Sequence, residues 1–206
     1  NNIASHKIVE HFALIKFSNT TNSNIEYEAG FRQHYYDLDA DNYTNKSSLL
    51  SRVRQNYAWS LGFNYILDNN RNFFGHISRS FRSPRLDEII SLVSPNPTST
   101  DIKHQYSHDI EIGHKIKSND SNYNVALYRS LIKNQIVYNS AAFANQNFDP
   151  SVQQGVELEF DTLINPNFKF VSNINYIDSH FTEGVEKGNE TPYVPKLSGN
   201  TSLYFN

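Results

Sequence analysis

Residues 104–138 read HQYSHDIEIGHKIKSNDSNYNVALYRSLIKNQIVY, and this stretch decides the fold. Apolar and polar residues alternate on both sides of a polar turn at Ser118 to Ser121. Period-two alternation places successive side chains on opposite faces of a β-strand. The apolar positions are Ile110, Ile112 and Ile116 before the turn, and Tyr123, Val125, Leu127 and Leu131 after it. The stretch therefore predicts a β-hairpin with one apolar face and one polar face.

The composition excludes a membrane protein with transmembrane helices but allows one with transmembrane β-strands. The chain has 206 residues, of which 38% are hydrophobic, and its mean hydropathy is −0.60. No window approaches the ~18 apolar residues of a transmembrane helix, which excludes that class. A two-faced strand of roughly 9 to 11 residues averages to a polar segment, so a transmembrane β-barrel stays possible.

The counts of individual residue types exclude further classes of protein. The 13 Tyr and 14 Phe suit strands and interfacial belts. The absence of Cys excludes disulfide frameworks, thiolate zinc sites and cysteine nucleophiles. A formal net charge of −3 argues against nucleic acid as the main partner. Because the chain has no Met and no signal peptide, we interpret it as an internal piece of a larger protein.

The same alternation predicts nine strands, joined by connections that alternate in length. Short polar connections are expected near 19–23, 67–71, 118–121 and 165–167, and long ones near 38–54, 83–103, 139–152 and 182–195. This layout is typical of an outer-membrane barrel, which has short periplasmic turns and long extracellular loops. The expected strands are 6–18, 24–37, 55–66, 72–82, 104–117, 122–138, 153–164, 168–181 and 196–206.

The turn lengths predict a register that keeps all apolar residues on one face, because a slip of one residue would reverse every side chain. The closing pairs expected for the four hairpins are Phe17 with Ile25, Ile66 with Asn72, Lys117 with Asn122, and Ile164 with Phe168. An aromatic girdle is expected beside the short turns, at Phe17, Tyr65, Phe73, Tyr123 and Phe168.

Two arginines interrupt the apolar face. Arg79 and Arg129 each lie about eight residues above a short turn, which at ~3.3 Å per residue and a tilt near 45° is roughly 19 Å. We predict that both guanidinium groups reach the outer lipid interface, where lipid phosphate would bind them. The competing interpretation is a local error in the register.

Residues 81–89, Phe-Arg-Ser-Pro-Arg-Leu-Asp-Glu-Ile, resemble the "FRAPxLxEL" segment of TonB-dependent outer-membrane receptors. The resemblance continues at Pro95-Asn96-Pro97, Asp109 to Gly113, Asn134 to Tyr138, Gly155 to Glu159 and Pro192 to Pro195, in the family's order. His104-Gln105 departs from it, where Pro-Glu is usual. The matching motif positions are Phe81, Arg82, Pro84, Leu86, Glu88, Gly113, Gly155, Glu157 and Pro195.

The resemblance implies a 22-stranded antiparallel transmembrane β-barrel with an N-terminal plug domain and a segment that engages TonB. Residues 1–206 would be part of the barrel domain, with the plug and the final strands absent. The protein would be a multi-pass receptor in the outer membrane of a Gram-negative bacterium and would import a scarce nutrient with energy from TonB. A ferric siderophore or similar iron complex is the expected ligand, on family frequency alone. The expected partners are outer-membrane lipid, TonB and a ferric chelate, with no cofactor.

Several residues are of types that act in catalysis or metal binding, but their positions have simpler explanations. Glu157, Glu159 and Asp161 share one strand face, as solvated lumen residues would. His104 and His108 invite a haem or metal interpretation. However, residues 83–95 lack the histidine usual in haem receptors, and no cluster has zinc-ligand spacing. No metal site is therefore predicted.

The extracellular loops hold the expected ligand contacts, namely Tyr43, Arg82, Arg85, Lys103 and His104, although ordinary solvated loop surface would show the same residues. Three alternatives from other classes stay open. A passive porin or adhesin barrel would lack the plug. A soluble β-sandwich would cover the apolar faces 57–65 and 123–131 with a second sheet. A barrel phospholipase would need a serine site, and no G-x-S-x-G segment is present, so no enzyme is predicted.

Overall fold

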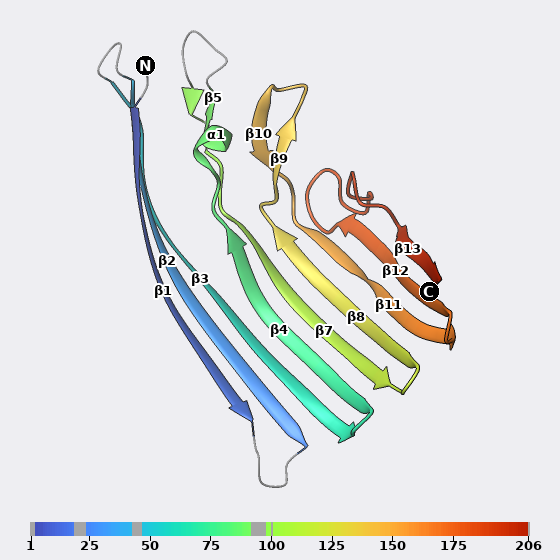
Figure 1. The fold of residues 1–206 in the computed structure, drawn as a ribbon. Helices are drawn as coiled ribbons and strands as arrows, with labels where there is room; N and C mark the ends of the chain where they lie inside the picture. Colours follow the sequence, from blue (N-terminus) through green and yellow to red (C-terminus); the bar gives the residue numbers. More distant parts are fainter. Residues whose placement is uncertain (1–2, 19–23, 43–46, 92–97, 100, 206) are drawn as a thin grey trace.

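The described part of the chain forms one curved, open antiparallel sheet. The structure is a computed structural model, and it describes residues 3–18, 24–42, 47–91, 98–99 and 101–205. Within these residues nine strands pair in the order β1-β2-β3-β4-β7-β8-β11-β12-β13, so each strand lies beside its neighbours in the chain (Figure 1). The strands are β1 (Ile3–Ser18), β2 (Ile25–Asn42), β3 (Ser47–Asp68), β4 (Arg71–Arg82), β7 (Gln105–Lys117), β8 (Ser121–Lys133), β11 (Ser151–Asn165), β12 (Phe168–Phe181) and β13 (Leu197–Phe205).

The remaining elements are small and belong to the loops. One turn of helix, α1 (Leu86–Ile89), follows β4 and precedes β5 (Ile90–Ser91), which pairs with β6 (Thr98–Ser99). A second small hairpin joins β9 (Ile136–Asn139) to β10 (Ala144–Asn147). Figure 1 places these elements at the upper end of the sheet and the turns β3–β4, β7–β8 and β11–β12 at the lower end. The predicted layout of short turns on one rim and long loops on the other is confirmed for these parts of the chain.

Two of the four predicted registers are confirmed at the closing pair. Ile66 pairs with Asn72 and Lys117 pairs with Asn122. In β3–β4 the predicted pair of Trp59 with Arg79 is present, and in β7–β8 the predicted pair of Gly113 with Ala126. A short turn leaves the ladder few alternative alignments, which is why turn length alone was sufficient here.

The other two closing pairs were wrong, although the apolar face was right. Phe17 pairs with Tyr27 rather than Ile25, a shift of two residues. Phe168 pairs with Asn165, because a bulge between Leu163 and Asn165 leaves Ile164 out of the ladder. Above the bulge the predicted pairing returns, as in the pair of Leu158 with Ile174. A shift of two residues, or a bulge at the turn, preserves the face of every residue above it.

Two predicted segments also have different limits. The expected loop 38–54 is mostly strand, since β2 continues to Asn42 and β3 begins at Ser47. The expected strand 122–138 divides, because β8 ends at Lys133 and Asn134 adopts a φ of 54°. Asn tolerates this left-handed conformation better than most residues. The chain therefore leaves the main sheet at this position and starts the separate β9–β10 hairpin.

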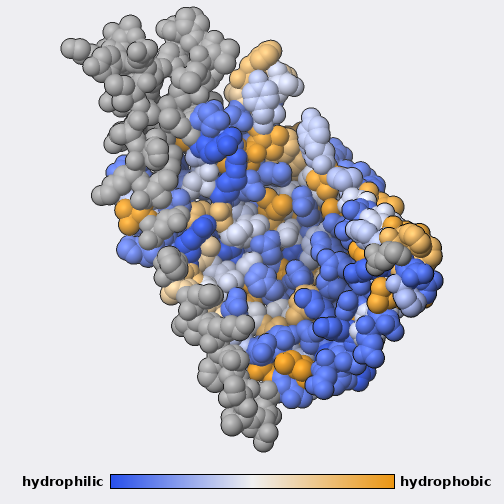
Figure 2. All heavy atoms as spheres, in the orientation of Figure 1, coloured by the Kyte–Doolittle hydropathy of each residue, from blue (hydrophilic) through white to orange (hydrophobic). Residues whose placement is uncertain are grey.

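The two faces of the sheet differ sharply. One carries the predicted apolar residues, and these stay solvent-accessible in the described structure: Ile110 is 55% exposed and Leu127 is 51% exposed. The face turned to the viewer in Figure 2 is mostly hydrophilic. No second sheet packs on the apolar residues of 57–65 and 123–131 in the described part of the chain. The described sheet thus lacks the covering sheet that the soluble β-sandwich alternative requires.

Aromatic side chains form a row on the apolar face near the short turns. Tyr123 contacts Phe160 at 4.9 Å between ring centroids, and Phe160 contacts Phe170 at 5.5 Å. Phe168 contacts Phe205 at 5.0 Å. The predicted girdle is confirmed for Tyr65, Phe73, Tyr123 and Phe168, whereas the side chain of Phe17 lies outside the described ones.

The apolar face also holds two histidines, of which the sequence analysis considered only His108, and that one only as a metal or haem ligand. His108 pairs with Arg79, and His114 pairs with Phe73, whose ring stacks on the imidazole at 4.3 Å. Both stand an even number of residues from Ile110 and Ile112 on β7, so they share the face of these isoleucines. Among the described residues no helix has the length and apolarity needed to span a membrane.

Candidate functional site

The polar face of the sheet is organised as a continuous cross-strand row. Directly opposite positions across six strands are occupied by Asn72, Lys115, Asn124, Glu159, Asn173 and Asn200. Within the row, Asn124 Nδ2 donates to Glu159 Oε2 at 3.0 Å, and the backbone N–H of Asn200 donates to Asn173 Oδ1 at 3.1 Å. The predicted clustering of Glu157, Glu159 and Asp161 on the polar face is confirmed by this register.

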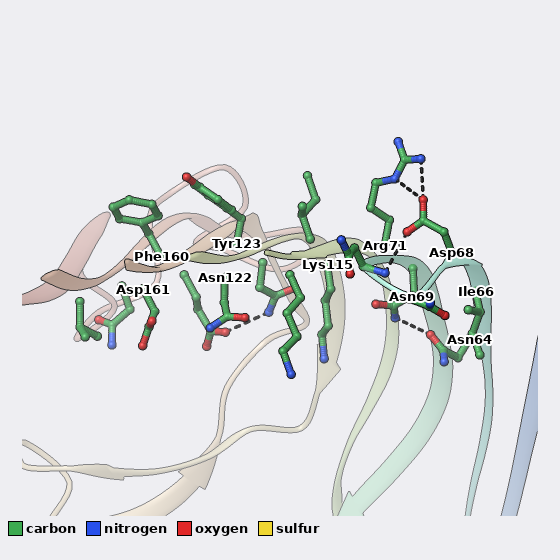
Figure 3. Close-up of a pocket in the computed structure, with 18 of the residues that line it drawn as sticks. Asn64, Ile66, Asp68, Asn69, Arg71, Lys115, Asn122, Tyr123, Phe160 and Asp161 are labelled. Atoms are coloured by element: carbon green, nitrogen blue, oxygen red, sulfur yellow. Dashed lines mark hydrogen bonds and ion pairs between the residues drawn. The ribbon is translucent and has the colours of Figure 1, made fainter. Parts of the chain in front are cut away.

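This row borders a concave trough of about 680 Å³ close to the short turns. Figure 3 shows Asn64, Lys115, Asn122 and Asp161 on one side of the strands, with Tyr123 and Phe160 on the other. Lys169 Nζ lies 2.6 Å from Asp161 Oδ2, so part of the charge near the trough is compensated. The trough is open and lined by amides and charged groups together with apolar side chains such as Ile66 and Val171, which suits solvent and polar contacts rather than acid–base catalysis.

Two glycines of the family motifs allow side chains to lie flat on this face. A Cβ at Gly113 would stand 2.2 Å from Phe74 Cζ, and one at Gly155 would stand 2.1 Å from the backbone oxygen of Tyr176 and 2.7 Å from Tyr128 Oη. Tyr128 Oη donates to Asn175 Oδ1 at 3.3 Å across the space that Gly155 leaves. Both glycines therefore serve close packing.

The segment 81–89 is an anchoring turn at the loop rim. Glu88 forms an ion pair with Arg82 and accepts the backbone N–H of Arg85 at 2.8 Å through its other carboxylate oxygen. Ile89 is 1% exposed, and its N–H donates to the Arg85 carbonyl at 3.2 Å. Asn145 Nδ2, on β10, donates to the Glu88 carbonyl at 3.4 Å. Glu88 thus links the end of β4, α1 and the neighbouring loop.

A second clamp joins the loop before β7 to the β9–β10 hairpin. Asn147 Oδ1 accepts the Lys103 N–H at 2.7 Å, while its Nδ2 donates to the carbonyls of Lys103 at 3.0 Å and Asn134 at 2.8 Å. His104 is 5% exposed; its Nδ1 contacts the side chains of Asn56 and Ser83. These contacts fix the loop before β7 against the β9–β10 hairpin.

The structure separates the predicted ligand contacts into different environments. Tyr43 lies outside the described residues. Arg82 is engaged with Glu88, whereas Arg85 extends into solvent beside Asp87, at 3.4 Å. Lys103 and His104 come together with Asn56 around a groove of about 360 Å³. The burial of His104 favours a positioning role, and its predicted ligand contact stays untested, as do those of the other four residues.

One further cation was missed by the sequence interpretation. Arg54 lines the same groove and lies 3.6 Å from Asp101. It falls within the segment 38–54 that was expected to be a loop, and no local motif marks it. The available signal was the position of Val53 and Tyr57 in step with Trp59 and Leu61, which extends the apolar face of β3 toward Arg54.

The remaining motif positions have structural surroundings that suggest packing or turns. Pro84 is buried, and the Phe81 ring lies 4.6 Å from the Arg32 guanidinium and 5.3 Å from the His34 ring. Leu86 is part of α1, and its side chain is not among those described. Glu157 lies on the polar face, and Pro195 is exposed before β13.

Charges at the loop rim are paired locally. Lys196 Nζ binds the carboxylate of Glu190, and this hydrogen bond raises the pKa of Lys196 above its usual value. Among the described residues no group of three or more His, Asp or Glu side chains is placed to hold a metal ion. His104 and His108, considered together for haem, are separated by the fold: His104 is buried below the loops and His108 is exposed on the apolar face.

This architecture defines a class of protein. A two-faced antiparallel sheet, with turns at one rim and folded loops at the other, is a segment of a transmembrane β-barrel wall. The sheet is not closed in this chain.

The family follows from comparison with known proteins. Residues 13–206 match the family model described as "TonB dependent receptor-like, beta-barrel". The chain belongs to the TonB-dependent receptor family. Members of this family are outer-membrane transport receptors of Gram-negative bacteria rather than enzymes. A search of curated proteins gave no match.

Solved structures share the fold at low sequence identity. The ferric yersiniabactin uptake receptor FyuA from Yersinia pestis matches with a TM-score of 0.72 and 16% identity, over 98% of this chain and 32% of that chain. The ferric citrate transporter FecA matches with a TM-score of 0.76 and 15% identity, over 98% and 30%. The copper transporter OprC matches with a TM-score of 0.79 and 13% identity, over 98% and 33%. The chain thus spans about a third of these proteins.

Proposed function

We propose that this chain is part of the barrel domain of an outer-membrane receptor that imports a ferric siderophore or a similar iron complex, with energy from TonB. Residues 1–206 would form a multi-pass section of the wall, with the plug and the TonB-contacting segment elsewhere in the protein. The observation that carries the proposal is the family match over residues 13–206 on a sheet with one apolar and one polar face. The apolar face would contact lipid, and the polar face would line the lumen.

The loop rim supports a binding role for an anionic chelate. Arg54 and Lys103 line one groove, and Arg85 extends into solvent on the neighbouring turn. Cationic side chains in such positions favour anionic ligands. The anchoring by Glu88 and Asn147 would limit the entropy lost on binding, since the loops are already held in place.

The metal in the ligand is the least constrained part of the proposal. FyuA and FecA are iron receptors by their titles, and OprC is a copper transporter. All three share the fold with this chain, so the fold does not choose between the metals.

Uptake by the full-length receptor tests the function. Cells that express it in a host without other receptors for the chosen ferric siderophore should accumulate radioactive iron, and deletion of tonB should abolish this uptake. Uptake that survives tonB deletion would support the passive porin alternative and overturn the proposal. Accumulation of copper but not iron would overturn the choice of ligand and leave the TonB dependence intact.

Receptor variants locate the binding surface. The double variant Arg54→Gln and Lys103→Gln should weaken binding of an anionic ferric siderophore by about ten-fold, the usual effect of losing charge-assisted contacts. Lys117→Gln, at the short-turn rim, is the matched control and should bind as the unaltered receptor does. Equal affinity in the double variant would remove the groove from the binding surface.

A further inference from the structure

The apolar face ends, on the loop side, in a group of basic side chains. Arg79 on β4 pairs directly with His108 on β7. His108 in turn pairs with Leu131, and Arg129 pairs with Ile110, so His108 and Arg129 are diagonal neighbours. Directly opposite residues lie about 5 Å apart at Cβ, and diagonal ones about 7 to 8 Å apart. The basic group therefore extends over β4, β7 and β8, with His108 between the two arginines.

Neither arginine has a carboxylate partner among the described residues. Arg79 donates to the backbone oxygen of Tyr57 and lies 4.0 Å from the Tyr57 ring centroid and 5.2 Å from that of Tyr106. Arg129 Nη1 donates to Gln154 Oε1 at 3.1 Å. A guanidinium group has five N–H donors, so both retain capacity for an anion.

The contrast with the opposite rim is informative. Arg71, at the β3–β4 turn, donates to Asp68 Oδ2 through Nε at 2.8 Å and through Nη2 at 2.6 Å. The carboxylate that shares the Arg129 row is Asp178, which accepts Gln154 Nε2 at 3.0 Å and lies 3.6 Å from His180 Nδ1. Gln154 therefore separates Arg129 from Asp178. The cations at the upper edge of the apolar face are left for an external anion.

The surroundings select the kind of anion. Directly below the basic group, Ile77 is 44% exposed and Ile110 is 55% exposed. Above it, Tyr57 and Tyr106 have the amphipathic character typical of side chains at a membrane interface. A ligand that contacts both regions needs a phosphate and an alkyl chain, which a soluble phosphate lacks.

We propose that Arg79, His108 and Arg129 form a binding site for the phosphate of an anionic outer-leaflet lipid, whose acyl chain lies along Ile77 and Ile110. The arginines supply charge-assisted hydrogen bonds, and the imidazole N–H supplies one more. Tyr57 and Tyr106 hold the Arg79 guanidinium in place. The proposal rests on the outer-membrane location proposed above.

Native mass spectrometry of the purified full-length receptor tests the site. The receptor in neutral detergent is titrated with lipid A, a diphosphorylated glycolipid, and separately with phosphatidylcholine. The variant Arg79→Gln/Arg129→Gln should bind lipid A about ten-fold more weakly, with phosphatidylcholine binding unchanged. Arg129→Lys should stay within about three-fold of the unaltered receptor, because lysine also binds phosphate, as a point charge.

Controls separate the possible outcomes. Lys117→Gln removes a cation from the other rim and the other face, and it should leave lipid A binding unchanged. Unchanged lipid A binding in the double variant would overturn the proposal, and so would an equal loss for phosphatidylcholine. If the double variant does not assemble, Arg129→Gln alone decides by the same measurement. Iron uptake is measured separately in cells, so failure of the transport proposal would not affect this result.

Discussion

The two rims of the sheet are built by different physical means. At the short-turn rim, backbone ladders continue to the turn, as in the pairs of Ile66 with Asn72 and Lys117 with Asn122. At the loop rim, the chain is held by single side chains: Glu88 binds the end of β4 and the start of α1, and Asn147 binds Lys103, 44 residues away in the chain. The structure of the short-turn rim is therefore determined by the local sequence pattern, whereas the structure of the loop rim depends on individual residues.

The largest loss of stability is expected where an added side chain would clash with the backbone of the β-sheet. Gly155→Ala places a Cβ 2.1 Å from the Tyr176 backbone oxygen, and backbone atoms cannot move aside cheaply. Overpacking of this kind costs typically 1–3 kcal/mol, and we expect the upper end of that range for the full-length receptor. The free energy of unfolding is measured by titration with urea, with the loss of heat-modifiable gel migration as the signal for unfolding.

Gly62→Ala is the matched control for that substitution. Its Cβ would meet its nearest atom at 3.7 Å, an ordinary contact distance, so the change should be small. Equal destabilisation by the two substitutions would show that glycine flexibility, rather than close packing, is the important property at Gly155.

An intermediate effect, confined to the loop rim, is expected for Glu88→Ala. This change removes the ion pair with Arg82 and the acceptor of the Arg85 N–H. Loss of a charged acceptor costs about 1.5–3 kcal/mol locally. Hydrogen exchange in residues 83–91 should accelerate markedly, while exchange in β7 and β8 stays unchanged.

Asp87→Ala is the control at the adjacent position, because its side chain is 68% exposed and its contact with Arg85 is long, at 3.4 Å. It should leave exchange in 83–91 nearly unaffected. Acceleration that spreads into the strands after Glu88→Ala would contradict the independence of the two rims.

The smallest effect is expected at the ion pair of the polar face. Lys169 and Asp161 lie 2.6 Å apart, but their side chains are 40% and 33% exposed. Solvent screening limits such a pair to about 0.5 kcal/mol. The difference in urea midpoint between Lys169→Gln and the unaltered receptor should disappear at 1 M salt, and a difference that persists would indicate a packing role for the lysine stem.

The comparison of rims also explains what the sequence could predict. Alternation determines the face of a residue but not the register, since a shift of two residues leaves every face unchanged. Phe17 accordingly pairs with Tyr27 and not with Ile25. The bulge beside Ile164 escaped prediction for the same reason, because the pattern above it is intact.

Above the apolar part of the strands, toward the loops, the alternation of polar and apolar residues predicts the structure less well. The segment 38–54 is rich in polar residues around Asn42 to Ser48, so its pattern resembled a loop, although β2 and β3 extend into it. Alternation places His108 and His114 on the apolar face, in step with Ile110 and Ile112, but their polar side chains run against the apolar pattern of that face. At the loop rim, the Asn147 clamp joins residues 44 positions apart in the chain, a separation over which no local pattern acts.

The row from Asn72 to Asn200 has an electrical consequence. It contains one lysine, one glutamate and four asparagines, so its formal charge sums to zero. Its lysine and glutamate lie on β7 and β11, two strands apart, so a charged solute beside this row would meet amide dipoles and one charge of each sign. If this face lines the lumen, as proposed, the row would favour solutes of neither sign of charge.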